Sequence, residues 1–525
     1  MPASTPKVGP EHGNRHLTTT TASVDRDAAV VTRVLVTLIV VSTAARLAFA
    51  GLLDLGQDEA YALSVSRTFQ WSFFDHPPLA FWTAGAMQAL FGRDLVPWLL
   101  RLPFIVMFAG TTWATFALTR RFYGAAAGLW AATLLNTAPF FFASAGSWVV
   151  PDGPLMLTLL LAALCFDRAI AAPTDRANWP DWLLAGGFAG LALLSKYQAI
   201  PVLAGAFVLL VLPANRHWLR RPQPYAAAAV ALLLFSPVLV WNLANGWVSF
   251  VFQLGRGGGE RHVDLMLFGI LLLSEAAYLL PWMLVALLFA AFRGVAPKRG
   301  RAFLGALALP TILVFNVLPL LGAQGLPHWS MAGWLFLFPF LGGLMWAEVV
   351  RGRRWPGYFR AVSILTTAAI VLGGLSLMSD WRIFPGTDDI NRYLVEATSW
   401  SGVRQGFEDE HLLDRPNTFI GAMGWLDAAH LGEALRPAQP PVVLGGDPRG
   451  FAFLGNANAH LGQDAYFVAT PENLEDVRRF ITAHFDSVER VGDFLTAKGG
   501  MPAYSHIVLL AHHFSTPVVV PYGVK

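Results

Sequence analysis

The sequence predicts a polytopic α-helical membrane protein with about eleven transmembrane helices and a small C-terminal α/β domain outside the cytoplasm. Hydrophobic residues make up 55% of the 525 residues and charged residues 14%, against about 25% charged residues in soluble globular proteins. Apolar runs of about 20 residues, the length that crosses a bilayer core, recur between residues 34 and 379. This composition excludes a soluble enzyme, a disordered chain and a coiled coil.

The predicted spans begin with an uncleaved run at residues 34–53, because the polar residues 1–28 lack the layout of a cleavable signal peptide. The stretch 182–212 is too long for one ordinary span, and Lys196 and Pro201 interrupt it, so two short helices that meet at a break are expected there. The other runs lie near residues 96–118, 125–145, 153–170, 225–243, 265–291, 302–321, 330–349 and 361–379.

Basic residues predict the orientation, because Lys and Arg resist translocation across the membrane. One set of alternate loops carries fifteen of them and the opposite short loops carry four. This asymmetry predicts a multi-pass protein of the cell inner membrane with residues 1–28 as a cytoplasmic tail and residues 29–379 as the transmembrane part. The mildly basic net charge of +3 then reflects cytoplasmic anchoring residues, so no nucleic-acid partner is expected. The single cysteine, Cys165, excludes an intrachain disulfide and a thiolate metal cluster.

Residues 380–525 change to a composition with many charges and ordinary turn residues, and they are long enough for one small external domain. Short β-like runs alternate there with helix-like runs. The expected strands are Pro441–Leu444, Ala465–Val468 and His506–Leu510, and the expected helices are Trp425–Leu435 and Glu472–His484. Gly445–Gly446–Asp447 offers too few glycines for a phosphate-binding loop.

The first external loop, residues 54–95, carries two groups of polar residues. Asp58–Glu59–Ala60–Tyr61 supplies adjacent carboxylates, which can accept a proton from a hydroxyl or bind a divalent cation. Asp75–His76–Pro77–Pro78 places an acid and an imidazole on a stiff turn, because each proline fixes its φ angle. The alternative is that the acids are solvated loop charges and that the prolines only make a turn.

Two further charged residues lie at predicted helix ends. Asp152, in Pro151–Asp152–Gly153–Pro154, is expected as the N-cap of the span at residues 153–170, and capping alone would explain it. The same position also faces the loop that carries Asp58. Lys196 lies between two short apolar helices, where it could reach the lipid headgroups or bind an anionic lipid phosphate.

The remaining candidates lie in later external loops. Arg256 and Arg261 flank a glycine-rich segment that could close over a phosphate, although a solvated loop is the more common reading of such a segment. His328 and Trp329 form either an interfacial aromatic anchor or part of the same site.

The order of these motifs, together with Ser195–Lys196–Tyr197 and Trp241–Asn242, resembles that of bacterial GT-C glycosyltransferases over about residues 30 to 350. The resemblance is to the branch related to protein mannosyltransferases, the lipid A aminoarabinose transferase and the rhizobial galacturonosyltransferases. It implies a GT-C-like fold. It also implies transfer of a sugar from a polyprenyl-phosphate donor, on the outer face of the cytoplasmic membrane, to lipid A, lipopolysaccharide, another glycan or a protein. The tryptophan-rich signature of oligosaccharyltransferases is absent.

Carried over to this sequence, the resemblance makes Asp58 the base that activates the acceptor hydroxyl, with Glu59 in support and Asp152 as the second acid. Lys196 would hold the donor phosphate, helped by Arg256 or Arg261. The aminoarabinose transferases carry a lysine where this chain has His76, so the protonation state of His76 matters to phosphate binding. The remaining substrate contacts would come from Asp75, Tyr61, His328 and Trp329.

One carboxylate base and one or two cations suffice for displacement of a polyprenyl phosphate from an anomeric carbon. A single displacement inverts that carbon, and no second nucleophilic carboxylate is obvious opposite Asp58. Metal involvement is left open, with Asp58, Glu59, Asp75 and His76 as the residues that could hold a divalent cation. The competing interpretations are a lipid or solute transporter, because a broken helix with an intramembrane lysine is also a transporter feature, and a structural subunit of an envelope complex.

Overall fold

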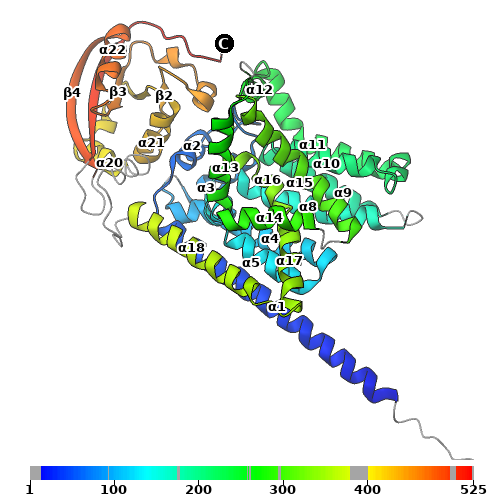
Figure 1. Cartoon of the computed structure of the whole chain (residues 1–525). Coiled ribbons are helices and arrows are strands. Elements are labelled where there is room, and N and C mark those ends of the chain that lie inside the picture. The colour runs from blue at the N-terminus through cyan, green and yellow to red at the C-terminus, as the bar shows by residue number, and fades with distance from the viewer. Residues whose placement is uncertain are drawn as a thin grey trace, which may run out of the picture.

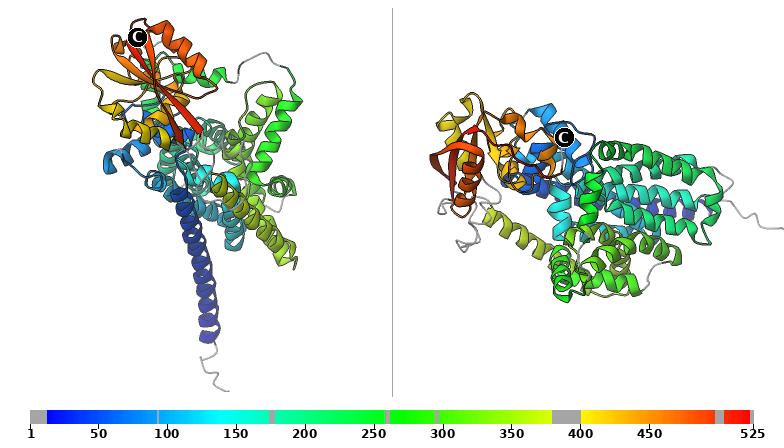
Figure 2. Two further views of the ribbon diagram at one scale, coloured as in Figure 1. Left: turned by 90° about the vertical axis from the view of Figure 1, so that its left-hand side faces the viewer. Right: turned by 90° about the horizontal axis from the view of Figure 1, so that it is seen from above.

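The computed structural model describes residues 13–92, 94–173, 178–256, 258, 262–293, 297–378, 400–496 and 504–522, with side chains from residue 28 onward. A bundle of helices and a smaller unit built on a β-sheet lie against each other (Figure 1). In Figure 2 the sheet unit lies at the end of the molecule opposite to the end from which α1 projects. The predicted fold class, a polytopic helical protein with a C-terminal α/β domain, is confirmed.

The helical part follows the predicted apolar runs, but several helices are shorter than the runs. Proline and glycine end many of them, since proline lacks the backbone N–H and glycine tolerates positive φ. The helices are α1 (Gly13–Leu52), α2 (Gln57–Val65), α3 (Leu79–Phe91), α4 (Pro97–Tyr123), α5 (Ala125–Asn136), α6 (Pro139–Phe142), α7 (Ser144–Ser147), α8 (Asp152–Ala171), α9 (Trp179–Ser195), α10 (Ala199–Val211), α11 (Pro222–Ala244), α12 (Val248–Gly255), α13 (Leu265–Leu279), α14 (Pro281–Arg293), α15 (Lys298–Leu320), α16 (Met331–Leu335), α17 (Phe338–Val350) and α18 (Trp355–Met378), with short 3₁₀ turns η1 (Arg216–Arg220) and η2 (Pro327–Trp329).

Seven helices among the described residues are long and apolar enough to cross a membrane, or up to nine if each of two bent pairs is one span. The predicted number of eleven is therefore not confirmed. The pair α5 with α6–α7 bends by 85° and the pair α13 with α14 by 95°, so these apolar runs are not straight helices. The predicted break at Lys196 is confirmed, because α9 ends at Ser195 and α10 begins at Ala199.

The C-terminal domain contains a five-stranded mixed sheet with the strand order β2-β1-β3-β5-β4. Strand β1 pairs in parallel with β2 and β3, while β5 pairs in antiparallel with β3 and β4. The sequence predicted β2, β3, β5, α21 and α22, but missed α20, β1 and β4. The elements are α20 (Ser401–Asp409), η3 (Leu412–Asp414), β1 (Thr418–Ala422), α21 (Trp425–Leu435), β2 (Val442–Val443), η4 (Arg449–Phe453), η5 (Ala457–His460), β3 (Asp464–Ala469), α22 (Leu474–His484), β4 (Phe485–Thr496) and β5 (Tyr504–Phe514).

The loop of residues 54–95 and the C-terminal domain share one hydrophobic core. Ala60 and Leu63 of α2 are buried in the same cluster as Ala428 and Leu431 of α21. The helices approach closely, since a Cβ added at Gly432 would lie 2.3 Å from the Ser64 hydroxyl. The C-terminal domain is therefore packed onto the membrane part and not merely tethered to it.

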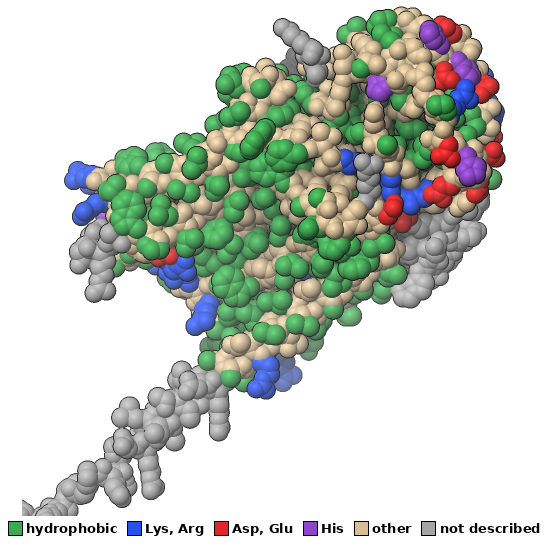
Figure 3. Space-filling model, turned by 180° about the vertical axis from the view of Figure 1, so that it is seen from behind, with side chains coloured by type: hydrophobic (Ala, Val, Ile, Leu, Met, Phe, Trp, Pro, Cys, Tyr) green, Lys and Arg blue, Asp and Glu red, His purple; other side chains and the backbone are tan. Residues whose placement is uncertain are grey.

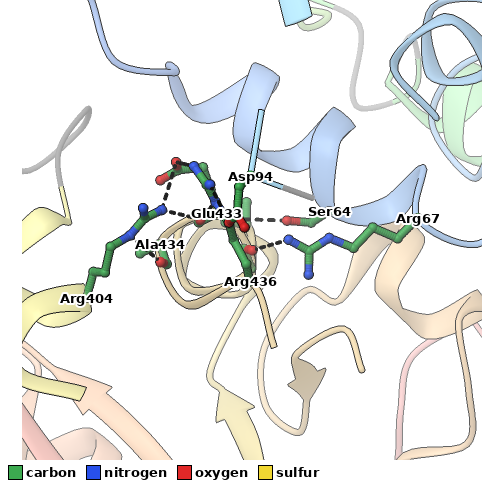
Figure 4. A network of polar contacts seen from close by, with 9 residues as sticks. Ser64, Arg67, Asp94, Arg404, Glu433, Ala434 and Arg436 are labelled. Carbon is green, nitrogen blue, oxygen red and sulfur yellow. Dashed lines mark hydrogen bonds and ion pairs between the residues drawn. The ribbon is translucent and has the colours of Figure 1, made fainter. Parts of the chain in front are cut away.

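Polar contacts surround this apolar contact between α2 and α21 (Figure 4). Arg67 donates to the carbonyls of Gly432 and Pro437 at 2.7 and 3.3 Å, and Ser64 donates to the carbonyl of Ala429. Arg436 forms an ion pair with Asp94 at 2.9 Å. These bonds fix the orientation of the domain, because each joins one side chain to a defined atom of the other part.

The surface charge of the two ends differs. On the face shown in Figure 3, hydrophobic side chains cover the helical part, basic side chains gather at its edges away from the sheet domain, and acids and histidines gather over the sheet domain. At the basic end, Asp167 of α8 pairs with both Arg121 of α4 and Arg299 of α15. The ends of these three helices therefore meet at the side that the sequence assigns to the cytoplasm.

A close helix contact provides a test of the packing. A Cβ added at Gly205 of α10 would lie 1.8 Å from the carbonyl oxygen of Ala306 in α15. We expect Gly205→Ala to lower stability by about 1–3 kcal/mol, because the helices must separate. The midpoint of thermal unfolding of the purified protein in detergent measures this. Gly187→Ala is the matched control, because a Cβ there meets nothing within 4 Å; equal melting of the two variants would contradict the packing.

Candidate functional site

A buried ion pair joins two helix ends at the side that faces the C-terminal domain. The ammonium group of Lys196, at the break between α9 and α10, donates to both oxygens of Asp152 at 2.9 and 2.7 Å. The two residues retain 1% and 4% of their accessible surface. The prediction that Asp152 caps α8 is wrong. Pro151 is the N-cap, Asp152 is the first helical residue, and its side chain makes no capping bond, because the carboxylate turns to the lysine.

A second buried ion pair fixes α2. Arg101 of α4 binds both carboxylate oxygens of Glu59, at 2.8 and 2.5 Å. The same guanidinium donates to the carbonyls of Ala50, Leu53 and Asp54. Glu59 also accepts the backbone N–H groups of Gly56 and Val149, each at 3.0 Å. All strong acceptor positions of Glu59 are thus occupied, and its carboxylate positions α2 instead of facing the same space as Asp58.

Asp58 points in a different direction from its neighbour, because successive residues of a helix are about 100° apart. It is the exposed member of the group of site carboxylates, whereas Glu59, Asp75 and Asp152 are buried. Protein atoms still surround it closely enough that loss of hydration raises its pKa, and the charges of Arg449 and Lys196 oppose that shift. Asp58 therefore combines access for a substrate with increased basicity.

Asp75 is buried and forms a hydrogen bond with Tyr61. The Tyr61 hydroxyl donates to Asp75 Oδ1 at 3.0 Å and accepts the backbone N–H of Gly450 at 3.1 Å. Burial raises the pKa of Asp75 to about 6, against the opposing charge of Arg449. Gln253 of α12 donates to the carbonyl of Asp75 at 2.5 Å. Tyr61 and Asp75 thus connect the first loop, α12 and the C-terminal domain.

Burial lowers the pKa of both histidines of the site. Burial, followed by the charges of Lys196, Arg256 and Arg449, holds the pKa of His76 well below its usual value. Burial and Lys196 act in the same direction on the pKa of His328. Three cations from different elements, Lys196, Arg256 and Arg449, therefore lower the pKa of His76.

Arg256 stacks on the ring of Trp329, with its guanidinium carbon 4.8 Å from the ring centre, and donates to Gln324 at 3.1 Å. The structure thus places Arg256 and Trp329 in contact. Arg261 lies outside the described residues. The proposed metal set of Asp58, Glu59, Asp75 and His76 is not brought together, because Glu59 is held by Arg101 and no group of three potential ligands is found among the described residues.

Sequence reasoning missed Arg449, which enters the site from the C-terminal domain. Its guanidinium lies 3.9 Å from Asp75 Oδ2 and 3.9 Å from the centre of the Trp425 ring. The arginine follows the Gly445–Gly446–Asp447 turn, which drew attention in the sequence but matched no phosphate-binding pattern. Nothing in the local sequence places that turn next to a loop near the N-terminus.

The ion pair at Arg101 gives a stability prediction. Arg101→Leu leaves the Glu59 carboxylate buried without its cation, so we expect a loss of about 3–5 kcal/mol. Equilibrium denaturation of the purified protein in detergent measures this loss. Arg168→Gln is the control, because Arg168 pairs with Asp181 at the surface and such pairs contribute below about 1 kcal/mol. A loss no larger than that of the control would contradict the assigned role.

The chain is similar to known proteins in part of its sequence and in its fold. Residues 75–241 match the family of dolichyl-phosphate-mannose-protein mannosyltransferases. The structure is similar to apo ArnT from Cupriavidus metallidurans, with a TM-score of 0.61 and 14% identity over 92% of this chain and 98% of that one. ArnT from the same organism bound to undecaprenyl phosphate gives a TM-score of 0.60 and 15% identity over 93% and 99%. A search of curated protein sequences finds no match.

The match over residues 75–241 and the shared fold agree with the resemblance to GT-C glycosyltransferases that the motifs carry. The overall fold is similar to that of ArnT. The fold likeness covers both the helical part and the C-terminal domain, since it extends over nearly the whole of each chain.

Proposed function

We propose that this enzyme transfers a sugar from a polyprenyl-phosphate donor to a hydroxyl group on the outer face of the cytoplasmic membrane. The observation that carries the proposal is the environment of Asp58, an exposed carboxylate whose pKa is raised by loss of hydration and on which the charges of Arg449 and Lys196 act. A base for the acceptor and cations for a leaving phosphate are the groups that this reaction requires. The complex of ArnT with undecaprenyl phosphate supports this class of donor.

In the proposed reaction, the acceptor oxygen attacks the anomeric carbon of the sugar while its proton passes to the Asp58 carboxylate. The bond between that carbon and the phosphate oxygen breaks, and its electron pair leaves with the polyprenyl phosphate. Lys196 has three N–H donors, and two of them bind Asp152. The third is left for a phosphate oxygen, and Asp152 orients the ammonium group.

Arg256 is the second proposed phosphate contact, because stacking on Trp329 leaves the edge of its guanidinium free for a planar pair of oxygens. Glu59 is a positioning residue for Asp58. The proposed acceptor is lipid A, lipopolysaccharide, another glycan or a protein, approached from the side of Asp75, Tyr61 and His328. The basic end formed by Arg121, Arg299 and their neighbours supports a cytoplasmic location for that end, with residues 380–525 outside.

We expect Asp58→Asn to reduce transfer by about 10² to 10⁴-fold, because the amide accepts no proton from the acceptor. Membranes with wild-type or variant enzyme are supplied with a panel of labelled polyprenyl-phosphate sugars, and label is counted in the lipid, lipopolysaccharide and protein fractions. Asp476→Asn is the control, since Asp476 forms an exposed ion pair with Arg479 within α22. Equal labelling by wild type and Asp58→Asn would exclude Asp58 as the base.

We expect the product to have the inverted anomeric configuration. A single displacement at the anomeric carbon gives inversion, whereas retention requires a second carboxylate that attacks from the opposite face. Asp75 is bound by Tyr61 and Glu59 by Arg101, so neither is free for that attack. Nuclear magnetic resonance of the isolated product distinguishes the two anomers, and a retained configuration would refute the single-displacement mechanism.

A further inference from the structure

The C-terminal domain presents Arg449 to the site in a fixed conformation. Its φ angle is +42°, in the left-handed region that a non-glycine residue adopts only where its surroundings impose it. Two bonds impose it here. Asp447 Oδ1 accepts the backbone N–H of Arg449 at 3.0 Å, and the Tyr61 hydroxyl accepts the N–H of Gly450 at 3.1 Å. Such strain in an enzyme is found most often at functional positions.

The guanidinium of Arg449 is held in place but donates no hydrogen bond among the described residues. It lies over Trp425, and its ion pairs with Asp447 and Asp75 are long, at 3.5 and 3.9 Å. Its Nε–H is buried without an acceptor. A buried donor without a partner is costly, so this arrangement is favourable when an anion supplies the missing acceptor.

Arg101 provides the internal comparison. That arginine is equally part of the interface between helix ends and loop, yet its Nε, Nη1 and Nη2 atoms all donate hydrogen bonds, to Glu59 and to three carbonyls. Arg101 is thus a saturated structural residue. Arg449 has the same chemistry with its planar fork of donors unused, which is the geometry that binds two oxygens of a phosphate.

Arg449 and Arg256 approach the same space from two domains. Arg449 is stacked on Trp425 and Arg256 on Trp329. Among the described residues, neither arginine donates a hydrogen bond to a carboxylate. Burial and the charge of Arg449 lower the pKa of Arg256, so the two cations lie close enough to repel each other. Like charges held together by stacking are stabilised by an anion between them.

Aromatic side chains pack the turn that bears Arg449 against the segment that carries Asp75. Phe74, next to Asp75 in the chain, is fully buried. The centre of its ring lies 5.7 Å from that of Phe453 in η4 and 4.4 Å from that of Tyr522. Tyr522 also donates to Asp447 at 3.0 Å. The turn that bears Arg449 is therefore fixed to the Asp75–His76 segment by aromatic packing as well as by hydrogen bonds.

From these contacts we infer that Arg449 of the C-terminal domain binds the phosphate of the lipid-linked donor together with Lys196 and Arg256. The inference rests on the proposed function. If Arg449 binds the phosphate, the C-terminal domain completes the donor site, and the membrane part alone does not form it.

The test is equilibrium binding to the purified full-length protein in detergent, with undecaprenyl phosphate, undecaprenol and inorganic phosphate as probes. Wild type is expected to bind undecaprenyl phosphate more tightly than undecaprenol. Arg449→Gln is expected to weaken binding of undecaprenyl phosphate by about tenfold or more and to leave that of undecaprenol unchanged. Arg415→Gln is the control, because Arg415 pairs with Asp464 on the surface of the same domain.

The ratio of the affinities for undecaprenyl phosphate and undecaprenol separates the outcomes. If Arg449 had a purely structural role, its substitution would weaken the binding of both lipids equally. A wild-type protein without preference for undecaprenyl phosphate would refute the proposed donor. A preference that survives in Arg449→Gln would overturn the inference and leave the proposed function standing. If inorganic phosphate competes as well as the lipid, the site binds free anions, and the inference is also overturned.

Arg449→Lys keeps the positive charge but lacks the planar donors of the guanidinium, so a smaller loss of affinity is expected. If the ratio of the two lipid affinities is unchanged in every folded Arg449 variant, the assignment is refuted.

Discussion

The bidentate ion pair between Glu59 and Arg101 is the interaction on which the site depends. It joins the start of α2 to α4, and Arg101 also holds the carbonyls at the end of α1. Both charges are buried, so neither can be satisfied by water if the other moves. The pair fixes the rotation of α2, and that rotation places Asp58 toward the cations and Tyr61 toward Asp75.

The second constraint is the common core of the first external loop and the C-terminal domain. The contact of α2 with α21 is apolar at its centre and bounded by the bonds of Arg67, Arg436 and Ser64. The loop also contacts the membrane part, through α3 against α4 and α9 and through residues 73–75 against α12. The domain and these helices together order the loop that carries Asp58 and Asp75, and docking of the domain brings Arg449 to Asp75.

Sequence reasoning succeeded for residues whose chemistry is unusual for their position. Lys196 in an apolar run and Asp152 at a helix start both stood out, and the structure brings them together. The position of Asp152 relative to the helix end was wrong by one residue, because a carboxylate bound to a buried ammonium is not free to cap. Only the family resemblance gave Asp58 and Glu59 different roles. Adjacency in the chain does not reveal which of the two carboxylates an arginine forty-two residues away will bind. Arg449 gave no signal, because an arginine after a turn is an ordinary surface residue until the domain is docked.

The sequence by itself determined the fold class and carried the resemblance to GT-C glycosyltransferases, since apolar runs and the order of short motifs are properties of segments that need no partner. It also determined the break at Lys196 and most elements of the C-terminal domain. The number of spans was not confirmed, because proline breaks and bends of 85° and 95° depend on packing between helices. Only the tertiary structure decided which carboxylate remains accessible and which arginine completes the site. The accessibility of Asp58 and the position of Arg449 depend on contacts between segments far apart in the chain. A local sequence pattern does not predict such contacts.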